Sequence, residues 1–576
     1  MNTEPIITTP SPPPPGDEVQ RWLVTRRLLG APTGATALRR MKPARTGRLL
    51  RIRCDRSLPF EFVDEFLDAF LDTWGAHHRT TYSDYDPGLA QIDAPGVAAD
   101  LRVIFLDWRL VADRLSPAEA AAWVSGRAHA AIRAGDRRAP VLLNNWPVKA
   151  GDPREAWMRG LNDALAALPG QLPGLTLIDL EAVRAELAGE FFDSRNDAVS
   201  KFPFASAAAI AIARHLGADL FPSLVGERIK ALVLDLDDTL WRGVLGEEGP
   251  DNLGIEAGHA ELHQLLKALR ARGILLTLCS RNQLADVEAV FRSRPELGLS
   301  LADFASVKVN WSRKVDNLAA IAAELNIDPS AMLFVDDNDS EIAKAAGAIP
   351  GLRTLLADPS GVETAKALRH YPGLFAVGKD SAASVRTEDI RANRGREELR
   401  SQAGDLNGYL AALKMEIGLH RTHRPHLLRV HELSNKTNQF NLALARLSAS
   451  ETEEAFGADH LTMTVSLKDA LSDSGLVGVL IARVEGELAT VREVLFSCRV
   501  LGREVETISL LWLCGWLEER GAKRIRFTVT EGPRNQPARD WLKRFLPEGT
   551  EAAIPEVKAR AEQACRTHPA AVLEHR

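Results

Sequence analysis

The chain has 576 residues, 45% hydrophobic and 26% charged, and a formal net charge of −6. This length predicts several domains rather than one core, and the charge gives no overall footprint for nucleic acid or an anionic membrane. No apolar run approaches about 20 residues, so we predict no transmembrane helix. The five cysteines are scattered without a Cys-x-x-Cys pair, which argues against a disulfide framework or a cysteine zinc site and favours reduced thiols in the cytoplasm.

The N-terminal part of the chain divides into a leader and a first folded unit. Residues 1–20 contain four consecutive prolines and lack the apolar core of a signal peptide, so we expect a disordered leader. Residues 21–225 alternate short apolar strands with helical stretches, which predicts an α/β unit with a parallel sheet. Strands are expected at residues 49–52, 103–106, 140–144 and 175–179.

Two polar segments of this first unit, residues 144–147 and 193–197, resemble remnants of an SGNH-hydrolase-like domain. Neither a Gly-Asp-Ser block near the start of the unit nor an Asp-x-x-His near its end accompanies them. We therefore expect a degenerate SGNH-like domain that serves for docking or for covering a neighbouring site.

Residues 226–373 again alternate strands and helices, as in a doubly wound parallel sheet of the Rossmann-like type. The first apolar strand leads into Asp235 and Asp237, which lie two residues apart and so project to the same side. Carboxylates this close repel each other by roughly 4 kcal/mol at an effective dielectric constant of about 20. They therefore require a cation or a shared proton, and the simplest cation is Mg²⁺.

Further polar residues follow the later strands of this unit. A second strand ends in Ser280-Arg281-Asn282, Lys314 follows, and a third strand ends in Asp336-Asp337. The order Asp-x-Asp-x-Thr, Ser, Lys, Asp-Asp resembles the four motifs of the haloacid dehalogenase superfamily of phosphotransferases.

This resemblance implies a role for each residue. Asp235 would be the nucleophile that takes a phosphoryl group, and Asp237 would protonate the leaving group and later activate water. Lys314 would offset the charge of the nucleophile and bind a phosphoryl oxygen. The phosphate-binding residues implied are Ser280, Arg281, Asn282 and Lys314.

The same resemblance implies a magnesium site formed by Asp235, the backbone carbonyl of Asp237, Asp336 and Asp337. The intervals between the motifs have room for helices and short loops but for no lid domain, so we expect a capless, open site. Such a site either accepts a large partner or is covered by another domain of the chain.

The C-terminal part of the chain is expected to hold a helical connector at residues 374–407, an α+β unit at 408–555 and a C-terminal tail at 556–576. A helix expected at residues 426–433 leads into a polar run, residues 434–441. Later segments are expected as strands at residues 461–466, 476–484 and 494–498, a turn at 473–475 and a helix at 507–520.

The segment that joins the last of these strands to the last helix carries Arg499 and Gly502. A strand, Arg-x-x-Gly and a helix resemble the pyrophosphate-binding turn of Gcn5-like N-acetyltransferases, where backbone N–H groups at a helix start hold the anion.

Five segments together, residues 241–247, 279–282, 335–338, 435–441 and 497–503, resemble the FkbH-like family, also called HAD-IIIC. Its members resemble glyceryl transferases. The resemblance implies a donor such as 1,3-bisphosphoglycerate, a glyceryl thioester on the enzyme, removal of the remaining phosphate, and transfer to the phosphopantetheine thiol of an acyl carrier protein in polyketide-type biosynthesis.

Cys498 is the candidate acyl-bearing thiol, because a strand tip beside Arg499 at a helix start lowers the pKa of a thiol. The alternative of a small buried hydrophobic residue stays open for Cys498. Cys279 is a rival thiol, although its place before Ser280 favours a buried strand role. The acyl- or carrier-binding residues implied are Asn435, Lys436, Asn438, Gln439, Asn441, Arg499 and Gly502.

Two segments depart from the family pattern: His431-Glu432 and residues 442–445. We expect these departures to affect which acyl group or which donor the enzyme uses. Two other functions stay open. One is a stand-alone phosphatase of a small molecule or phosphoprotein without acyl transfer, and the other is a non-enzymatic scaffold that binds the carrier protein.

Overall fold

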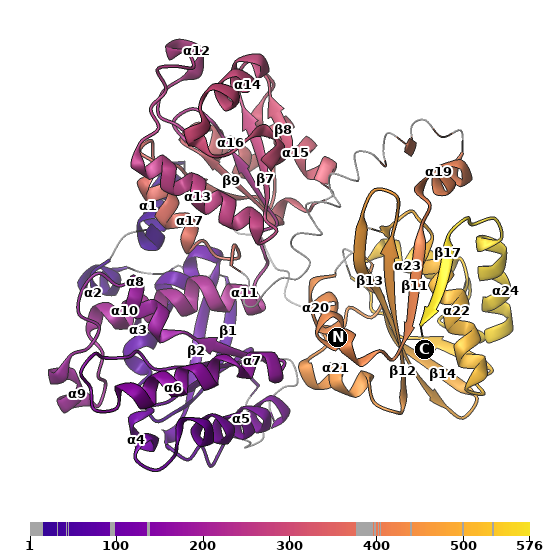
Figure 1. The fold of residues 1–576 in the computed structure, drawn as a ribbon, viewed down its shortest axis with the longest axis horizontal. Coiled ribbons are helices and arrows are strands. Elements are labelled where there is room, and N and C mark those ends of the chain that lie inside the picture. The colour runs from indigo at the N-terminus through magenta and orange to yellow at the C-terminus, as the bar shows by residue number, and fades with distance from the viewer. Residues whose placement is uncertain are drawn as a thin grey trace, which may run out of the picture.

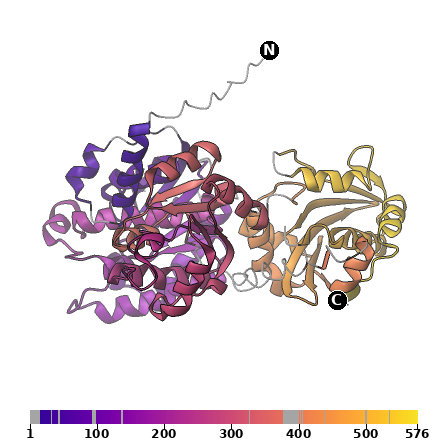
Figure 2. The same cartoon turned by 90° about the horizontal axis from the view of Figure 1, so that it is seen from above.

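The structure is a computed structural model that describes residues 15–30, 33–41, 43, 45, 47–92, 98–134, 139–325, 327–375, 396, 399–400, 403, 405–437, 440–497, 500–532 and 535–575. These residues form three units, each built on one sheet. In Figure 1 the first two units lie against each other and the third lies to one side. Figure 2 shows the same separation from above.

The first unit is an all-parallel sheet covered by helices, as the sequence predicts. Its strand order is β2-β1-β3-β4-β5. All four predicted strands are present, and β2 is an additional one that the prediction missed because His77, His78 and Arg79 interrupt its apolar pattern. The strands are β1 (Arg48–Arg56), β2 (Ala76–Tyr85), β3 (Leu101–Phe105), β4 (Val141–Asn144) and β5 (Leu175–Ile178). Helices around it include α3 (Glu61–Leu71), α5 (Pro117–Ala134), α6 (Glu155–Ala166) and α10 (Ser206–Arg214).

One continuous helical stretch of this unit, Ser206–Val225, has the length and composition of a membrane span, which differs from our expectation of no such run. It combines α10, a π-helical segment (His215–Leu220) and α11 (Phe221–Val225). Its most apolar window has a mean hydropathy of 1.2 and is 72% buried. This burial is what a core helix of the first unit requires.

The expected disordered leader is too long, because α1 (Pro15–Gly30) begins inside it. Residues 1–14 lie outside the described residues. Helix α1 packs against α17 (Val362–Arg369) of the central unit, which follows it only much later in the chain. Arg26 Nη1 donates to the carbonyl oxygens of Leu356 at 3.0 Å and Ala357 at 2.7 Å. The N-terminal helix therefore covers the central unit.

The central unit is a five-stranded parallel sheet with helices on both faces, which confirms the predicted doubly wound core. Its strand order is β10-β9-β6-β7-β8, so the first strand of the unit lies in the middle. The strands are β6 (Ala231–Leu234), β7 (Leu275–Ser280), β8 (Phe304–Val309), β9 (Met332–Asp336) and β10 (Arg353–Leu356). The principal helices are α13 (Ala257–Ala271), α14 (Leu284–Ser293), α15 (Lys314–Leu325) and α16 (Asp339–Ala348).

The intervals between the motifs of this unit hold no lid domain in the described residues. The interval from Asp235 to Ser280 contains the short α12 (Leu245–Glu248) and α13, and the interval from Lys314 to Asp336 contains α15 and a 3₁₀ turn. The core is therefore capless, as predicted.

The C-terminal unit is a mixed, seven-stranded sheet with the order β16-β15-β14-β13-β12-β11-β17. Neighbouring strands are antiparallel except for the pairs β14 with β15 and β11 with β17. The strands are β11 (Glu416–Arg421), β12 (His460–Lys468), β13 (Asp473–Glu485), β14 (Leu488–Phe496), β15 (Arg524–Phe527), β16 (Glu551–Ala553) and β17 (Ala571–His575). The helices include α19 (Leu406–Leu413), α20 (Leu427–Lys436), α21 (Ala449–Ala455), α22 (Val505–Glu519), α23 (Gln536–Lys543) and α24 (Ile554–Cys565).

Two expectations for this part of the chain need correction, and a third concerns residues that lie mostly outside the described ranges. Residues 556–576 are not a separate tail, because α24 packs on α22 and β17 pairs with β11. Residues 473–475 begin β13 instead of forming a turn between strands. Most of the expected connector at 374–407 lies outside the described residues.

The apolar core follows the same division. Buried side chains of the first unit and of part of the central unit form one continuous cluster, and a second cluster lies within the central unit. The C-terminal unit has core clusters of its own. A hydrogen bond also links the first two units, since His370 Nδ1 lies 3.2 Å from Asp219 Oδ2. The first two units thus form one packed body that carries the acidic strand ends.

Candidate functional site

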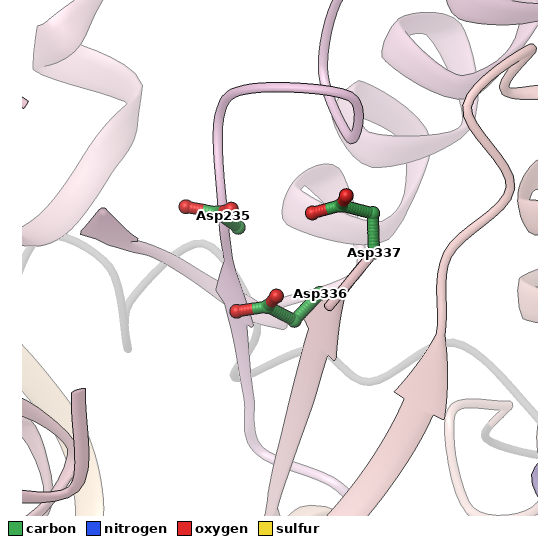
Figure 3. Close-up of side chains that lie close together, drawn as sticks. All are labelled: Asp235, Asp336 and Asp337. Carbon is green, nitrogen blue, oxygen red and sulfur yellow. The ribbon is translucent and has the colours of Figure 1, made fainter. Parts of the chain in front are cut away.

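Three carboxylates meet at the carboxyl edge of the central sheet. Strands β6 and β9 are parallel neighbours, so both end at this edge. Asp235 follows β6 directly, Asp336 is the last residue of β9, and Asp337 comes next. One carboxylate oxygen from each of the three lies within 4.8 Å of the other two, and among the described residues this is the one group of three or more His, Cys, Asp or Glu side chains gathered so closely. Figure 3 shows the three side chains turned toward a common space.

Lys314, the first residue of α15, lies against two of these carboxylates. Its Nζ is 2.9 Å from Asp235 Oδ2 and 2.6 Å from Asp336 Oδ2, and all three side chains are buried. Burial lowers the pKa of Lys314, but the two carboxylates outweigh it and hold that pKa above the ordinary value. One cation therefore faces three acidic groups.

The excess of negative charge at this site raises the pKa values of two of the acids. Burial and the neighbouring Asp235 raise the pKa of Asp336 to about 7, and the same two causes raise the pKa of Asp337 to about 6. Lys314 lowers both pKa values but does not cancel the rise. A further cation at this edge would favour the ionised form of both groups.

The donor set fits Mg²⁺. Asp235 Oδ1 is buried and has no hydrogen-bond partner among the described residues. The hydroxyl oxygen of Thr239 is also buried and also lacks a hydrogen-bond partner among them. An unpaired buried carboxylate oxygen is costly, and a bound cation would satisfy it. Hard oxygen ligands from carboxylates are those that Mg²⁺ prefers.

Asp237 lies beside this group but its carboxylate is held in a different way. Oδ1 accepts from Trp241 Nε1 at 3.0 Å and from the backbone N–H of Leu245 at 3.1 Å, and Oδ2 accepts from Asn282 Nδ2 at 2.9 Å. Burial raises the pKa of Asp237 although these three hydrogen bonds lower it. The side chain is thus fixed in place and suited to hold a proton. Sequence reasoning missed the contact with Trp241, although this tryptophan stands in the same run.

Three of the four predicted phosphate-binding residues lie at the end of β7, and two of these three reach the site. Ser280 is buried, and Asn282 Nδ2 reaches its Oγ at 3.2 Å as well as the Asp237 carboxylate. Arg281 points elsewhere: its Nη2 lies 3.4 Å from Glu341 Oε1 of α16, and 43% of its side chain is exposed. The structure therefore gathers Ser280 and Asn282 with the acids, and Arg281 stays at the rim.

Cys279 is placed as the buried-strand interpretation expects. It lies on β7, fully buried, with Sγ 3.8 Å from the carbonyl oxygen of Lys314. Burial raises the pKa of the Cys279 thiol to about 12, so this thiol is not activated as a nucleophile.

Several predicted residues of the C-terminal unit fall outside what the structure describes. These are Asn438, Gln439, Cys498 and Arg499, together with the side chain of Lys436. The described residues on either side of Cys498 are Ser497, directly after β14, and Val500, whose N–H donates to the Ser497 carbonyl at 3.1 Å.

The other predicted residues of this unit support the backbone. Asn441 is buried and forms a bridge to Leu495 at the end of β14, and its Oδ1 accepts from the N–H of Leu444 at 2.6 Å. Asn435 Nδ2 donates to the His431 carbonyl at 2.9 Å. Gly502 has φ of +79°, a conformation that favours glycine. Their role in binding an acyl group or carrier stays a prediction.

Polar residues at the strand ends of the first unit are bonded to one another. Asn144 is buried and accepts from the N–H of Leu106 at 2.7 Å, while Arg109 pairs with both Asp107 and Asp197. These contacts show how the segments that resemble SGNH remnants are held, and they suit a structural role.

No family model and no curated protein matches the sequence. Among solved structures, the chain is similar to the N-terminal part of the protein BF1531 from Bacteroides fragilis, which contains a phosphatase domain and is complexed with Mg; the identity is 20%, the TM-score 0.48, and the match covers 62% of this chain and 99% of that chain. A predicted HAD-like family hydrolase from Porphyromonas gingivalis is 17% identical with a TM-score of 0.19, over 23% of this chain and 92% of its own.

The chain is also similar to the PaiA N-acetyltransferase from Thermoplasma acidophilum, a structure in complex with coenzyme A. The identity is 12% and the TM-score 0.19, and the match covers 22% of this chain and 86% of that one.

Proposed function

We propose that this protein is a Mg²⁺-dependent phosphotransferase in which Asp235 takes a phosphoryl group from a small phosphorylated donor. The observation that carries the proposal is the setting of Asp235. One of its oxygens pairs with Lys314, the other is buried with no hydrogen-bond partner in the described part of the chain, and two more carboxylates each have an oxygen within 4.8 Å. A purely structural acid has no need of such surroundings.

Asp235, Asp336 and Asp337 would hold the Mg²⁺, with the backbone carbonyl of Asp237 as a further ligand. When bound, the ion supplies positive charge for the phosphoryl oxygens and the surrounding carboxylates. Lys314 supplies a second, fixed positive charge in the same place.

The residues of the chain account for both halves of the reaction. In the first, an Asp235 oxygen attacks phosphorus, the bond from phosphorus to the leaving oxygen breaks, and Asp237 gives its proton to that oxygen. In the second, Asp237 takes a proton from water, the water oxygen attacks phosphorus, and the bond to Asp235 breaks. The raised pKa of Asp237 suits an acid that must hold its proton until the leaving group departs.

The finer proposal concerns the donor and the acceptor. We propose a phosphorylated three-carbon acyl donor such as 1,3-bisphosphoglycerate, whose glyceryl unit passes through Cys498 to the thiol of an acyl carrier protein in the cytoplasm. The support is the resemblance of five sequence segments to the FkbH-like family, together with a C-terminal unit whose strand β14 ends directly before the Cys498 segment. A stand-alone phosphatase is the competing function, and it needs only the central unit.

Intact-protein mass spectrometry tests these functions together. The enzyme is incubated with Mg²⁺, 1,3-bisphosphoglycerate generated in place and a phosphopantetheinylated carrier protein, and free phosphate is measured in parallel. We expect a glyceryl-sized adduct on the carrier and release of phosphate. Asp235→Asn should release less phosphate per donor than wild type, because only the acyl phosphate that Cys498 displaces still leaves, whereas Cys498→Ala should abolish the adduct and leave phosphate release detectable. Equal phosphate release by Asp235→Asn and wild type would overturn the phosphotransferase proposal, and phosphate without any adduct would favour the stand-alone phosphatase.

A further inference from the structure

Four histidines gather at one edge of the C-terminal sheet. His420 near the end of β11 is the register partner of His575 on β17. Their rings stack with centroids 4.5 Å apart and 10° between the planes. His426, in the 3₁₀ turn after β11, lies 4.8 Å from His420 and 4.6 Å from His423 between ring centroids. No step of the proposed phosphotransfer uses this cluster.

The nitrogens of the two stacked rings face the same small space above Gly418. A Cβ atom placed on this glycine would lie 3.2 Å from His420 Nε2 and 3.7 Å from His575 Nε2, with the Ser466 hydroxyl also against it. His420 Nε2 and Ser466 Oγ are 3.1 Å apart. Two imidazole nitrogens and a hydroxyl oxygen from three adjacent strands therefore border one position.

Charged neighbours of the cluster are compensated within the protein. Arg421 pairs with Glu519 at 2.8 Å, and Arg424 pairs with Glu453 at 2.7 Å.

We infer that His420 and His575, completed by His426 and His423, bind a divalent transition-metal ion of the zinc type that fastens β17 to β11. Imidazole nitrogen is a preferred ligand of Zn²⁺, whereas Mg²⁺ prefers oxygen, so this site and the acidic site would sort two different metals. In the structure, the ring nitrogens of the four histidines lie farther apart than the ligand oxygens of the three aspartates. His423 and His575 are exposed, so rotation of their side chains can close the shell.

An ion at this position would stabilise the attachment of β17 to the sheet. This five-residue strand lies at the edge of the sheet, and among the described strands it pairs with β11 alone. A metal held by His420 and His575 would link the two strands through side chains as well as through the backbone.

Equilibrium dialysis of the full, untagged chain against ZnCl₂ in excess MgCl₂ tests the site, with the bound zinc counted by atomic absorption. We expect His420→Ala and His575→Ala each to lose about one zinc ion per chain relative to wild type. His129→Ala, which removes an exposed histidine of α5, and Asp336→Asn, which alters the acidic site, should keep that ion. His575 is exposed, so its variant is expected to fold, and circular dichroism checks this.

Hydrogen exchange of residues 571–575 gives a second readout that a merely structural cluster would not produce. Zinc should slow exchange in this strand in wild type and in His129→Ala, and should leave it unchanged in His420→Ala. A double variant, His420→Ala with His575→Ala, that retains the zinc content of wild type would overturn the inference, as would zinc binding that disappears only in Asp336→Asn.

Discussion

The ammonium group of Lys314 lies 2.6 Å from the Oδ2 atom of Asp336, the closest of its two contacts with buried acids. This pair joins the start of α15 to the end of β9 at the edge of the sheet where Asp235 also lies. Because the carboxylates outnumber the one ammonium group, the energetics of the site depend on which cation is present.

Replacement of Lys314 by Met should make the protein depend on Mg²⁺ for stability. Loss of one partner from a buried ion pair costs about 3–5 kcal/mol, because it leaves charge without compensation. We expect a lower melting temperature without Mg²⁺ and a larger Mg²⁺-induced rise than in wild type, together with loss of most phosphatase activity. Lys344→Met is the control, because the side chain of Lys344 is exposed and pairs with Glu341. A Mg²⁺-induced rise equal to that of wild type would show that Lys314 does not offset the charge that the ion offsets.

Asn282→Ala should slow the reaction and move its pH dependence. Asn282 donates to the Asp237 carboxylate and lowers the pKa of that group, so its removal raises the pKa further. The hydrolysis of the phosphoenzyme needs ionised Asp237, and the acidic limb of its pH profile should therefore shift to higher pH. Activity at the optimum should fall about 10- to 100-fold.

Single-turnover measurements across the pH range check this prediction for Asn282→Ala. Gln283→Ala serves as a matched control. Gln283 is the next residue in the chain, and its side chain accepts a hydrogen bond from the exposed Trp311. A uniform loss of rate with an unmoved acidic limb would speak against proton transfer by Asp237.

Glu493→Gln should alter stability in a pH-dependent way without touching the acidic site. Glu493 on β14 is buried, and burial raises its pKa from 4.5 to about 8. Between these two values the native state keeps a proton that the unfolded state releases, so wild-type stability falls as pH rises through that window, by up to about 1.4 kcal/mol per pH unit. The Gln variant lacks this decline.

Thermal unfolding between about pH 5 and pH 8 measures the difference between Glu493→Gln and wild type. The two melting curves should converge at the acidic end and separate at the basic end, with the variant more stable there. Glu485→Gln, on an exposed side chain of β13, should follow wild type throughout. Parallel pH dependences for Glu493→Gln and wild type would mean that the carboxyl group does not retain its proton in the folded protein.

Arg26→Ala should destabilise the central unit although Arg26 lies far from it in the chain. Its guanidinium donates to the carbonyl oxygens of Leu356 and Ala357, which follow each other at the end of β10. Loss of hydrogen bonds from a charged donor costs about 1.5–3 kcal/mol. Chemical denaturation of Arg26→Ala measures this cost, with the exposed neighbour in Arg27→Ala as control; equal stability of the two variants would show that α1 is not anchored there.

The central unit and its acidic site could be predicted from the sequence because local pattern and chemistry agree there. Strands β6, β7 and β9 are continuous apolar runs, as parallel strands buried on both faces must be, and each ends in the polar residues that the site uses. Parallel strands end at one edge, so the pattern alone places Asp235, Ser280 and Asp336 together.

Other features depend on tertiary contacts that no local pattern reveals. Strand β2 carries a polar surface and forms because it pairs with β1, and β17 is added to β11 from the end of the chain. Arg281 stands in the motif but turns to Glu341 of α16, a partner about which the order of the motifs says nothing. The four-histidine cluster joins residues 420 and 575, which only the fold of the C-terminal unit makes neighbours.

The position of β6 in the middle of its sheet has a consequence for how the protein is made. The strand that carries Asp235 is the first of the central unit to leave the ribosome, yet its two neighbours in the sheet are β7 and β9, which are synthesised later. A nascent chain that ends before Met332 therefore lacks Asp336 and Asp337 and has one side of β6 unpaired. The three carboxylates can meet only after β9 has been made and has paired with β6, and ion binding from then on favours the completed sheet over any partial one.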